Sequence, residues 1–115
     1  MTALLVTLAG ALGVLSRYGL STATEGPWAI AAINIAGSFA LGLMVASEWG
    51  TPQARAAVGA GFLGGFTTFS TFSVQAVQDI DAGDAGRALA YVAVSVGIGV
   101  LAAAAGFTLG RGLRA

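Results

Sequence analysis

The sequence contains no cysteine and no histidine among its 115 residues. The absence of cysteine excludes disulfides and thiolate metal sites, and the absence of histidine removes the commonest metal ligand and the usual proton shuttle. Acidic side chains are also missing from the long apolar stretches, so no carboxylate within them can serve as a base or a nucleophile. We therefore do not expect an enzyme.

Charged residues are rare, with five basic and five acidic side chains and a formal net charge of zero. Because the basic residues are not clustered, the sequence shows no electrostatic footprint for nucleic acid. The charges divide the chain into four apolar runs, three of which exceed the roughly 20 residues that a helix needs to cross a bilayer. We expect an all-α membrane protein with a single domain over 1–115 and four transmembrane helices, approximately at 2–20, 27–48, 56–78 and 88–110.

Two features of these segments argue against a cleaved signal peptide and against coupled transport. The first segment precedes Arg17 and has no basic residues before it, so we expect a spanning helix and not a cleaved secretory signal. A proton-coupled pump ordinarily needs an acid or a histidine inside the membrane, and none of the four segments contains one. This absence favours passive conduction over coupled transport.

The third segment contains the unusual stretch GFLGGFTTFSTFS, which runs from Gly61 to Ser73. A glycine pair and three threonines are poor material for a continuous helix. Where the backbone opens at membrane depth, its polar groups must be satisfied by protein, water or an ion, because lipid offers no partner. The stretch therefore predicts a helix that is broken at its centre, with a candidate ion site at the break.

Phenylalanine recurs in this stretch every three or four residues, so on one continuous helix Phe62, Phe66, Phe69 and Phe72 would share a face. A phenyl ring is electropositive at its edge, so Phe69 and Phe72 could offer successive edges to an anion. Hydroxyl and amide donors without an acid also suit an anion better than a hydrated cation. The alternative is that these phenylalanines only pack helices together.

Three polar residues stand out in the other segments. Asn34 needs a partner in the membrane, and it either bonds a neighbouring helix or lines a polar path. Arg17, expected in the last turn of the first segment, either extends towards the lipid headgroups or has a functional role. Tyr91 lies one helical turn from Ser95 and shares a face with it.

At these residues the sequence resembles the Fluc (CrcB) family of fluoride channels. The third-segment stretch resembles the signature of that family, and the resemblance extends over all four segments. The other matching positions are Gly10-Ala11, Arg17-Tyr18, Asn34, Gly37-Ser38-Phe39 and Tyr91. The resemblance implies a passive, fluoride-selective channel that exports fluoride across the plasma membrane, here the inner membrane of a prokaryote.

The resemblance also implies roles for individual residues in a fluoride path. Phe69 and Phe72 match the paired pore phenylalanines whose edges face fluoride. A hydroxyl track follows the same route, and two further polar side chains line it. The track and these two side chains correspond to Ser70, Thr71, Ser73, Asn34 and Tyr91.

Two further sites are implied by the resemblance. Arg17 matches an arginine near the aqueous vestibule, where a positive charge would concentrate anions. Gly64 and Thr67 match the pair whose main-chain carbonyls, from both subunits, hold a central structural sodium ion, Na⁺. One position departs from the family pattern, because Gln75 stands where the family usually has a glutamate. A role that needs a carboxylate at that position is therefore in doubt.

The arginines give only a weak preference for one orientation in the membrane. With four segments, one side carries Arg55, Arg111 and Arg114 and the other carries Arg17 and Arg87. Such a chain could insert both ways and pair with itself, and the resemblance implies an antiparallel, dual-topology homodimer with two fluoride paths.

Two other functions remain as alternatives. A small multidrug-resistance-type exporter has a similar length and four spans, but such proteins depend on a glutamate in the first span, and residues 2–16 contain no acid. A membrane packing protein without transport activity would need only small-residue patterns such as Gly106-xxx-Gly110, but it leaves the intramembrane hydroxyls unexplained.

Overall fold

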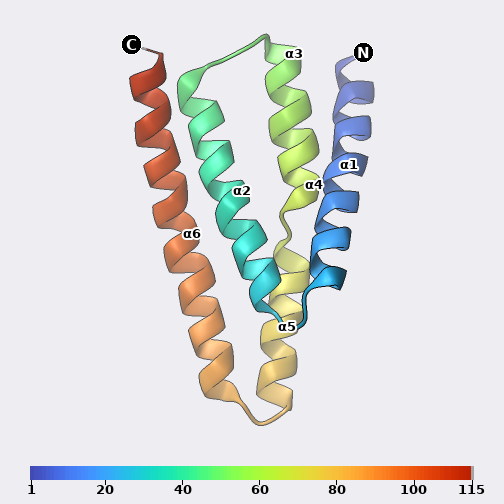
Figure 1. Ribbon diagram of the computed structural model, residues 1–115, viewed down its shortest axis with the longest axis vertical. Coiled ribbons are helices and arrows are strands. Elements are labelled where there is room, and N and C mark those ends of the chain that lie inside the picture. Colours follow the sequence, from blue (N-terminus) through green and yellow to red (C-terminus); the bar gives the residue numbers. More distant parts are fainter. Residues whose placement is uncertain (115) are drawn as a thin grey trace.

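The structure, a computed structural model, describes residues 1–114, and over that range every regular element is a helix. The chain runs as four rods with both termini at one end (Figure 1). In chain order the elements are α1 (Thr2–Ala23), α2 (Trp28–Ser47), α3 (Pro52–Arg55), η1 (Ala56–Leu63), α4 (Gly64–Phe66), α5 (Phe69–Asp81) and α6 (Ala85–Leu113).

Four helical segments are long and apolar enough to cross a membrane, and they are Thr2–Ala23, Trp28–Ser47, Pro52–Asp81 and Ala85–Leu113. This finding confirms the expected four spanning helices. Three of them extend past the expected bounds, and at the starts of the third and fourth a polar side chain caps the helix. At the start of α6, for example, Asp84 Oδ1 accepts a hydrogen bond from the Arg87 amide at 3.0 Å, which satisfies one of the free amides of the first turn.

The third span consists of several helical pieces. Pro52 begins α3, and the Thr51 side chain caps it by accepting from the Ala54 amide at 3.1 Å. The chain then widens into the π-helix η1, in which the Gly64 amide donates to the carbonyl of Gly59, five residues earlier. After the single turn of α4 the helix stops, and α5 begins at Phe69. The expected break at the centre of this span is confirmed.

The rods pack as two pairs, α2 with α6 and α1 with the first half of the third span. Small residues let the backbones approach in both pairs. A methyl group at Gly106 of α6 would collide with the Phe39 carbonyl of α2, and one at Gly13 of α1 would collide with the Phe62 carbonyl of η1. Close contact of this kind drives helix association in a bilayer, because lipid removes the hydrophobic force between helices.

One apolar cluster joins α2, α5 and α6, and its buried members are Ile30, Ala31, Ile33, Phe72, Ala76 and Tyr91. Outside this cluster most of the large apolar side chains remain exposed, as expected for surfaces that face lipid. The break in the third span lies next to this cluster, because Phe72 belongs to the first turn after it.

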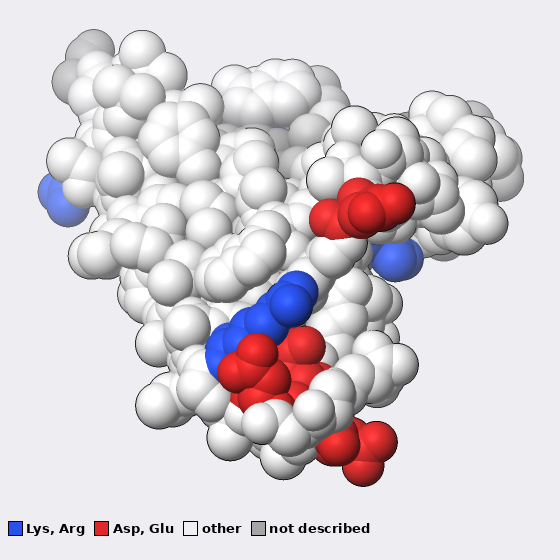
Figure 2. Space-filling view, turned by 60° about the horizontal axis from the view of Figure 1, so that its bottom comes forward, with Lys and Arg blue, Asp and Glu red and all other residues white. Residues whose placement is uncertain are grey.

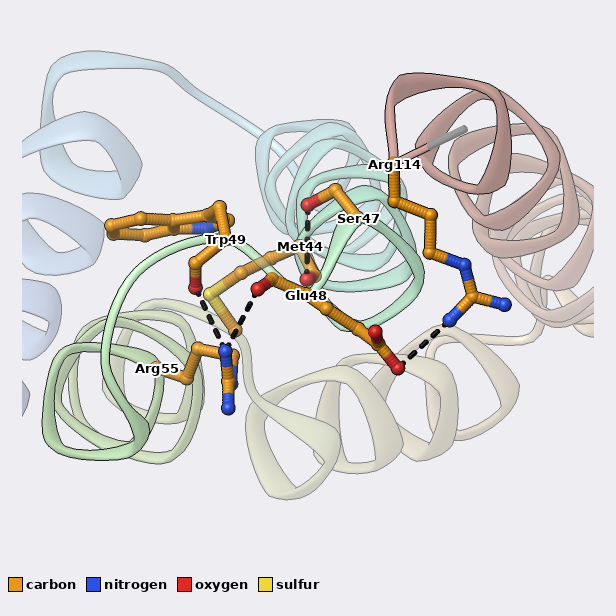
Figure 3. Close-up of polar contacts among 6 residues, drawn as sticks. All are labelled: Met44, Ser47, Glu48, Trp49, Arg55 and Arg114. Atoms are coloured by element: carbon orange, nitrogen blue, oxygen red, sulfur yellow. Dashed lines mark hydrogen bonds and ion pairs between the residues drawn. The ribbon is translucent and has the colours of Figure 1, made fainter.

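An arginine organises the end of the molecule that carries the termini. Helix α2 ends at Ser47, and the next residue, Glu48, has a left-handed conformation with φ of 54°. Arg55 Nη1 donates to the carbonyls of Glu48 at 2.9 Å, Trp49 at 3.1 Å and Gly50 at 2.9 Å. The Glu48 carboxylate in turn pairs with Arg114 Nη1 at 2.8 Å (Figure 3). These contacts tie the α2–α3 connection to the last turn of the chain.

Candidate functional site

The break itself consists of Thr67 and Thr68, which both have extended backbones. Their φ and ψ angles are −91° and 157° for Thr67 and −151° and 128° for Thr68. The Thr68 hydroxyl then caps α5 by accepting from the Thr71 amide at 3.3 Å. Threonine suits both positions, because its branched side chain favours extended backbone and its oxygen can cap a helix.

Asn34 of α2 pairs with the open backbone of the break. Its Nδ2 donates to the Thr68 carbonyl at 2.9 Å, and its Oδ1 accepts from the Thr68 amide at 2.8 Å. The side chain therefore satisfies both polar groups of one residue that has left the helix, where unpaired groups would cost several kcal/mol in lipid. Of the two interpretations of Asn34, the bond to a neighbouring segment is confirmed.

A cavity of about 400 Å³ opens beside the break, and we call it the break cavity. It is lined by residues from α2, the broken span and α6, and none of these side chains is ionisable. The lining residues are Asn34, Ser38, Gly64, Thr67, Thr68, Phe69, Phe72, Ser95 and Val96. Asn34 thus lines a cavity as well as bonding the break, and five of the residues expected in sites meet here.

The two phenylalanines after the break differ in burial. Phe69 is 77% exposed and Phe72 is 6% exposed, and their ring centres lie 5.7 Å apart. Phe62 and Phe66 form a separate stacked pair with ring centres 5.8 Å apart. The single face that one continuous helix would give these four rings does not apply, because the helix is interrupted between Phe66 and Phe69.

Arg17 lies against the other side of the break. Its Nε donates to the Gly65 carbonyl at 3.1 Å, and the side chain is partly buried. An uninterrupted helix would give this carbonyl the amide of residue 69. The expectation that Arg17 lies in the last turn is wrong, because α1 continues to Ala23, so the guanidinium reaches inward to the third span.

Residues 4–107 match the sequence profile of the family described as "CrcB-like protein, Camphor Resistance (CrcB)". The chain belongs to the CrcB family. A relative from Symbiobacterium thermophilum, named "Fluoride-specific ion channel FluC 1", is 39% identical, and the match covers 97% of this chain and 99% of the relative.

Two other relatives of this CrcB chain are named "Fluoride-specific ion channel FluC". A protein from Thermus thermophilus is 40% identical, with 96% of this chain and 94% of the relative covered. The protein from Deinococcus radiodurans is 43% identical, with 94% of each chain covered. The similarity therefore extends through all four spans and includes the break.

Tyr91 of this CrcB chain does not line the break cavity. It is fully buried, its hydroxyl donates to Gln75 Oε1 at 2.7 Å, and its ring packs edge-on against Trp28 with centres 5.6 Å apart. Its ring centre also lies 5.1 Å from that of Phe72, which does line the cavity. Tyr91 is thus one layer behind the cavity wall within a single chain.

The three residues of the expected hydroxyl track also lie outside the break cavity. Ser73 Oγ donates to the Phe69 carbonyl at 2.9 Å. The Ser70 hydroxyl is exposed and lies 3.3 Å from that of Thr68, and Thr71 is partly buried. In a single chain of this CrcB protein, Ser70 and Ser73 thus contact lining residues of the cavity but do not line it themselves.

Sequence reasoning missed two hydroxyls that the fold brings into the cavity. Ser95 of α6 is buried, and its Oγ has no hydrogen-bond partner among the described residues. Ser38 of α2 donates to the Asn34 carbonyl at 2.7 Å. The spacing of Ser95 from Tyr91 placed it on a face of α6, but only the packing of α6 on α2 shows that the cavity lies beside it.

Proposed function

We propose that this chain is a passive fluoride channel of the plasma membrane and not an enzyme. The observation that carries the proposal is the helix break that Asn34 holds open beside a cavity without ionisable side chains. Membership of a family whose members include fluoride-specific ion channels supports the same function. A small anion can be stabilised there by donors and ring edges, without an acid to repel it.

Two donors in the cavity are suited to a dehydrated fluoride ion. Asn34 Nδ2 uses one of its two protons on the Thr68 carbonyl, so the second remains for an anion. The Ser95 hydroxyl is buried and has no hydrogen-bond partner among the described residues. Fluoride would supply the missing acceptor, and the edges of Phe69 and Phe72 would complete its surroundings. Arg17 would raise the local anion concentration at the vestibule.

The functional unit in this proposal is an antiparallel homodimer with two fluoride paths. Phe69 is 77% exposed in one chain although it lines the cavity, and a second copy would cover it. A second copy would also bring Ser70, Thr71 and Ser73 into a shared route, which one chain alone does not achieve. Tyr91 would join that route if the layer between it and the break cavity opened.

A structural sodium ion at the centre of the dimer is part of the proposal. The Thr68 amide donates to Asn34 and the Thr71 amide donates to the Thr68 hydroxyl, so neither reaches its usual helical acceptor. Those acceptors are the carbonyls of Gly64 and Thr67. Carbonyl oxygens are hard ligands that suit Na⁺, and two from each subunit would provide four.

The other two functions find less support. An exporter of the small multidrug-resistance type would need an acid within the first span, and Glu25 lies beyond the end of α1. A protein that only packs in the membrane would not need an open break or a cavity.

Flux from liposomes tests the proposal. Purified protein should release trapped fluoride, measured with a fluoride electrode, and should retain trapped chloride. Replacement of the exposed Phe69 by leucine should reduce the fluoride flux without changing assembly, because an aliphatic side chain has no electropositive edge. Equal release of both anions by the unmodified protein would contradict the assignment, and undiminished flux in the Phe69→Leu variant would contradict the ring-edge mechanism alone.

A further inference from the structure

A second cavity, of about 280 Å³, lies between the α1–α2 connection and α5, and we call it the loop-end cavity. Unlike the break cavity it has a charged lining residue, Asp79. Its other lining residues are Ser21, Thr24, Gly26, Pro27, Gln75 and Gln78. The cavity lies at the end of the molecule opposite the termini.

A layer of contacting side chains links the linings of the two cavities. Phe72 lines the break cavity, and its ring centre lies 5.1 Å from that of Tyr91. The Tyr91 hydroxyl donates to Gln75 at 2.7 Å, and Gln75 lines the loop-end cavity. An anion that passes this layer would travel between the break and the aqueous end of α5.

Asp79 and Arg87 form a loose ion pair at the loop-end cavity. Arg87 Nε lies 3.5 Å from Asp79 Oδ2, an oxygen that is buried and accepts no hydrogen bond from the described residues. The Asp79 side chain is 18% exposed and that of Arg87 is 46% exposed. The guanidinium also lies beside Gly26, a lining residue, with Nη2 3.9 Å from the position that a Cβ would take there. Arg87 can therefore turn towards an incoming anion without first breaking a short hydrogen bond.

Because most of the surrounding charges are acidic, this ion pair strongly affects the electrostatic potential that an anion meets at the loop-end cavity. In Figure 2 a basic patch lies against acidic surface on this end of the molecule. The acidic residues near the loops at this end are Glu25, Asp79, Asp81 and Asp84, and Arg87 is paired with one of them, Asp79. Neutralising Asp79 would thus release the attractive charge of Arg87, and neutralising Arg87 would leave the repulsive charge of Asp79 at this cavity uncompensated.

We propose that Asp79 and Arg87 control the access of fluoride to the conduction path, with Arg87 attracting the anion and Asp79 limiting that attraction. The inference rests on the proposed function, because it assigns a role to this ion pair only if the chain conducts fluoride. It places one mouth of the path at the loop-end cavity and makes the electrostatic potential there depend on a pair formed by Asp79, one helical turn beyond Gln75 in α5, and Arg87 of α6.

Fluoride flux in liposomes, measured at low and high salt, tests the pair. The D79N variant should raise the initial flux by about threefold or more at low salt, and R87Q should lower it by a similar factor. The double variant D79N/R87Q should return close to the unmodified flux. All differences should shrink at high salt, where the Debye length falls to about 3 Å at 1 M.

The matched control is D81N, which removes the same charge from the same end at a residue that does not line the cavity. It should change the flux much less than D79N. Unchanged flux in D79N and R87Q, or an equal effect of D81N and D79N, would overturn the inference and leave the proposed function standing. Failure of the unmodified protein to conduct fluoride would overturn the proposed function, and the inference with it. If R87Q does not assemble, the D79N variant still tests the role of the ion pair, because an increase in fluoride flux cannot result from loss of folding.

Discussion

At the scale of single residues, Asn34 has the chemistry that the break requires. The backbone of Thr68 presents one donor and one acceptor, and the Asn34 carboxamide forms a hydrogen bond with each, at 2.8 Å and 2.9 Å. Aspartate would keep the acceptor but lose the donor, and leucine would lose both. The residue therefore holds the break open and still retains one proton for a ligand.

Replacement of Asn34 by leucine should destabilise the protein and abolish conduction. Each polar group of Thr68 that loses its partner costs about 1–3 kcal/mol when buried. The expected result is a lower thermal midpoint in detergent, together with loss of fluoride flux in liposomes. Ser47→Ala is the control, because it also removes a polar side chain from α2, but one whose hydroxyl bonds the Met44 carbonyl and does not line the break cavity. A leucine variant with unmodified stability would show that water or another group satisfies Thr68 instead.

At the scale of elements, the third span gives up helical hydrogen bonds in order to form the cavity. The cost is reduced because each released group finds another partner. Arg17 reaches the Gly65 carbonyl, Asn34 pairs with Thr68, and the Thr68 hydroxyl caps α5. Threonine keeps the two residues of the break extended, since its branched side chain is disfavoured in a helix.

A variant in which the third span is helical through residues 67 and 68 should conduct fluoride poorly. The double variant Thr67→Ala, Thr68→Ala replaces two residues of low helix propensity with the best helix former and removes the cap. We expect the flux to fall about tenfold or more, which corresponds to roughly 1.4 kcal/mol in the barrier. Amide hydrogen exchange should show new protection at residues 67–70.

Thr108→Ala is the control for this variant, because it makes the same chemical change at an exposed position within α6 and leaves the break residues in place. It should keep most of the flux. If the double variant gained helical protection and conducted as well as the unmodified protein, the open backbone would not be needed for conduction.

At the scale of the whole molecule, basic residues are spread almost evenly between the two ends, which leaves the orientation weakly determined. One end carries Arg55, Arg111 and Arg114, and the other carries Arg87, with Arg17 between the break and that end. Acidic residues are distributed unevenly between the two ends, since Glu48 is the acidic residue at the end with the termini and the other four lie at the opposite end. Orientation follows the basic residues, however, and acidic residues contribute little.

Dual insertion can be measured with single cysteines, because the chain has none of its own. Gln53→Cys and Asp81→Cys place one thiol at each end of the molecule. In intact cells an impermeant thiol reagent should label about half of the copies of each variant, since neither end has a strong excess of basic residues. Full labelling of one variant and protection of the other would exclude the antiparallel homodimer.

The sequence alone determined the class of this protein and the location of its break. Four long apolar runs can be stable only as membrane helices, and the absence of acids within them disfavours coupled transport. The glycine pair and the threonines before Ser73 weaken helix locally, so the break could be predicted from propensity. Hydrophobicity and propensity are properties of neighbours in the chain, which is why sequence reveals them.

Only the tertiary structure decided what meets at the break. The hydrogen bonds of Asn34 and Arg17 to the third span join residues that are 34 and 48 positions apart, and no local pattern encodes them. The burial of Tyr91 behind Phe72 and the arrival of Ser95 in the cavity depend on how α6 packs on α2. Helix packing sets these distances through close backbone contact at residues such as Gly106, and that contact exists only once the helices have assembled.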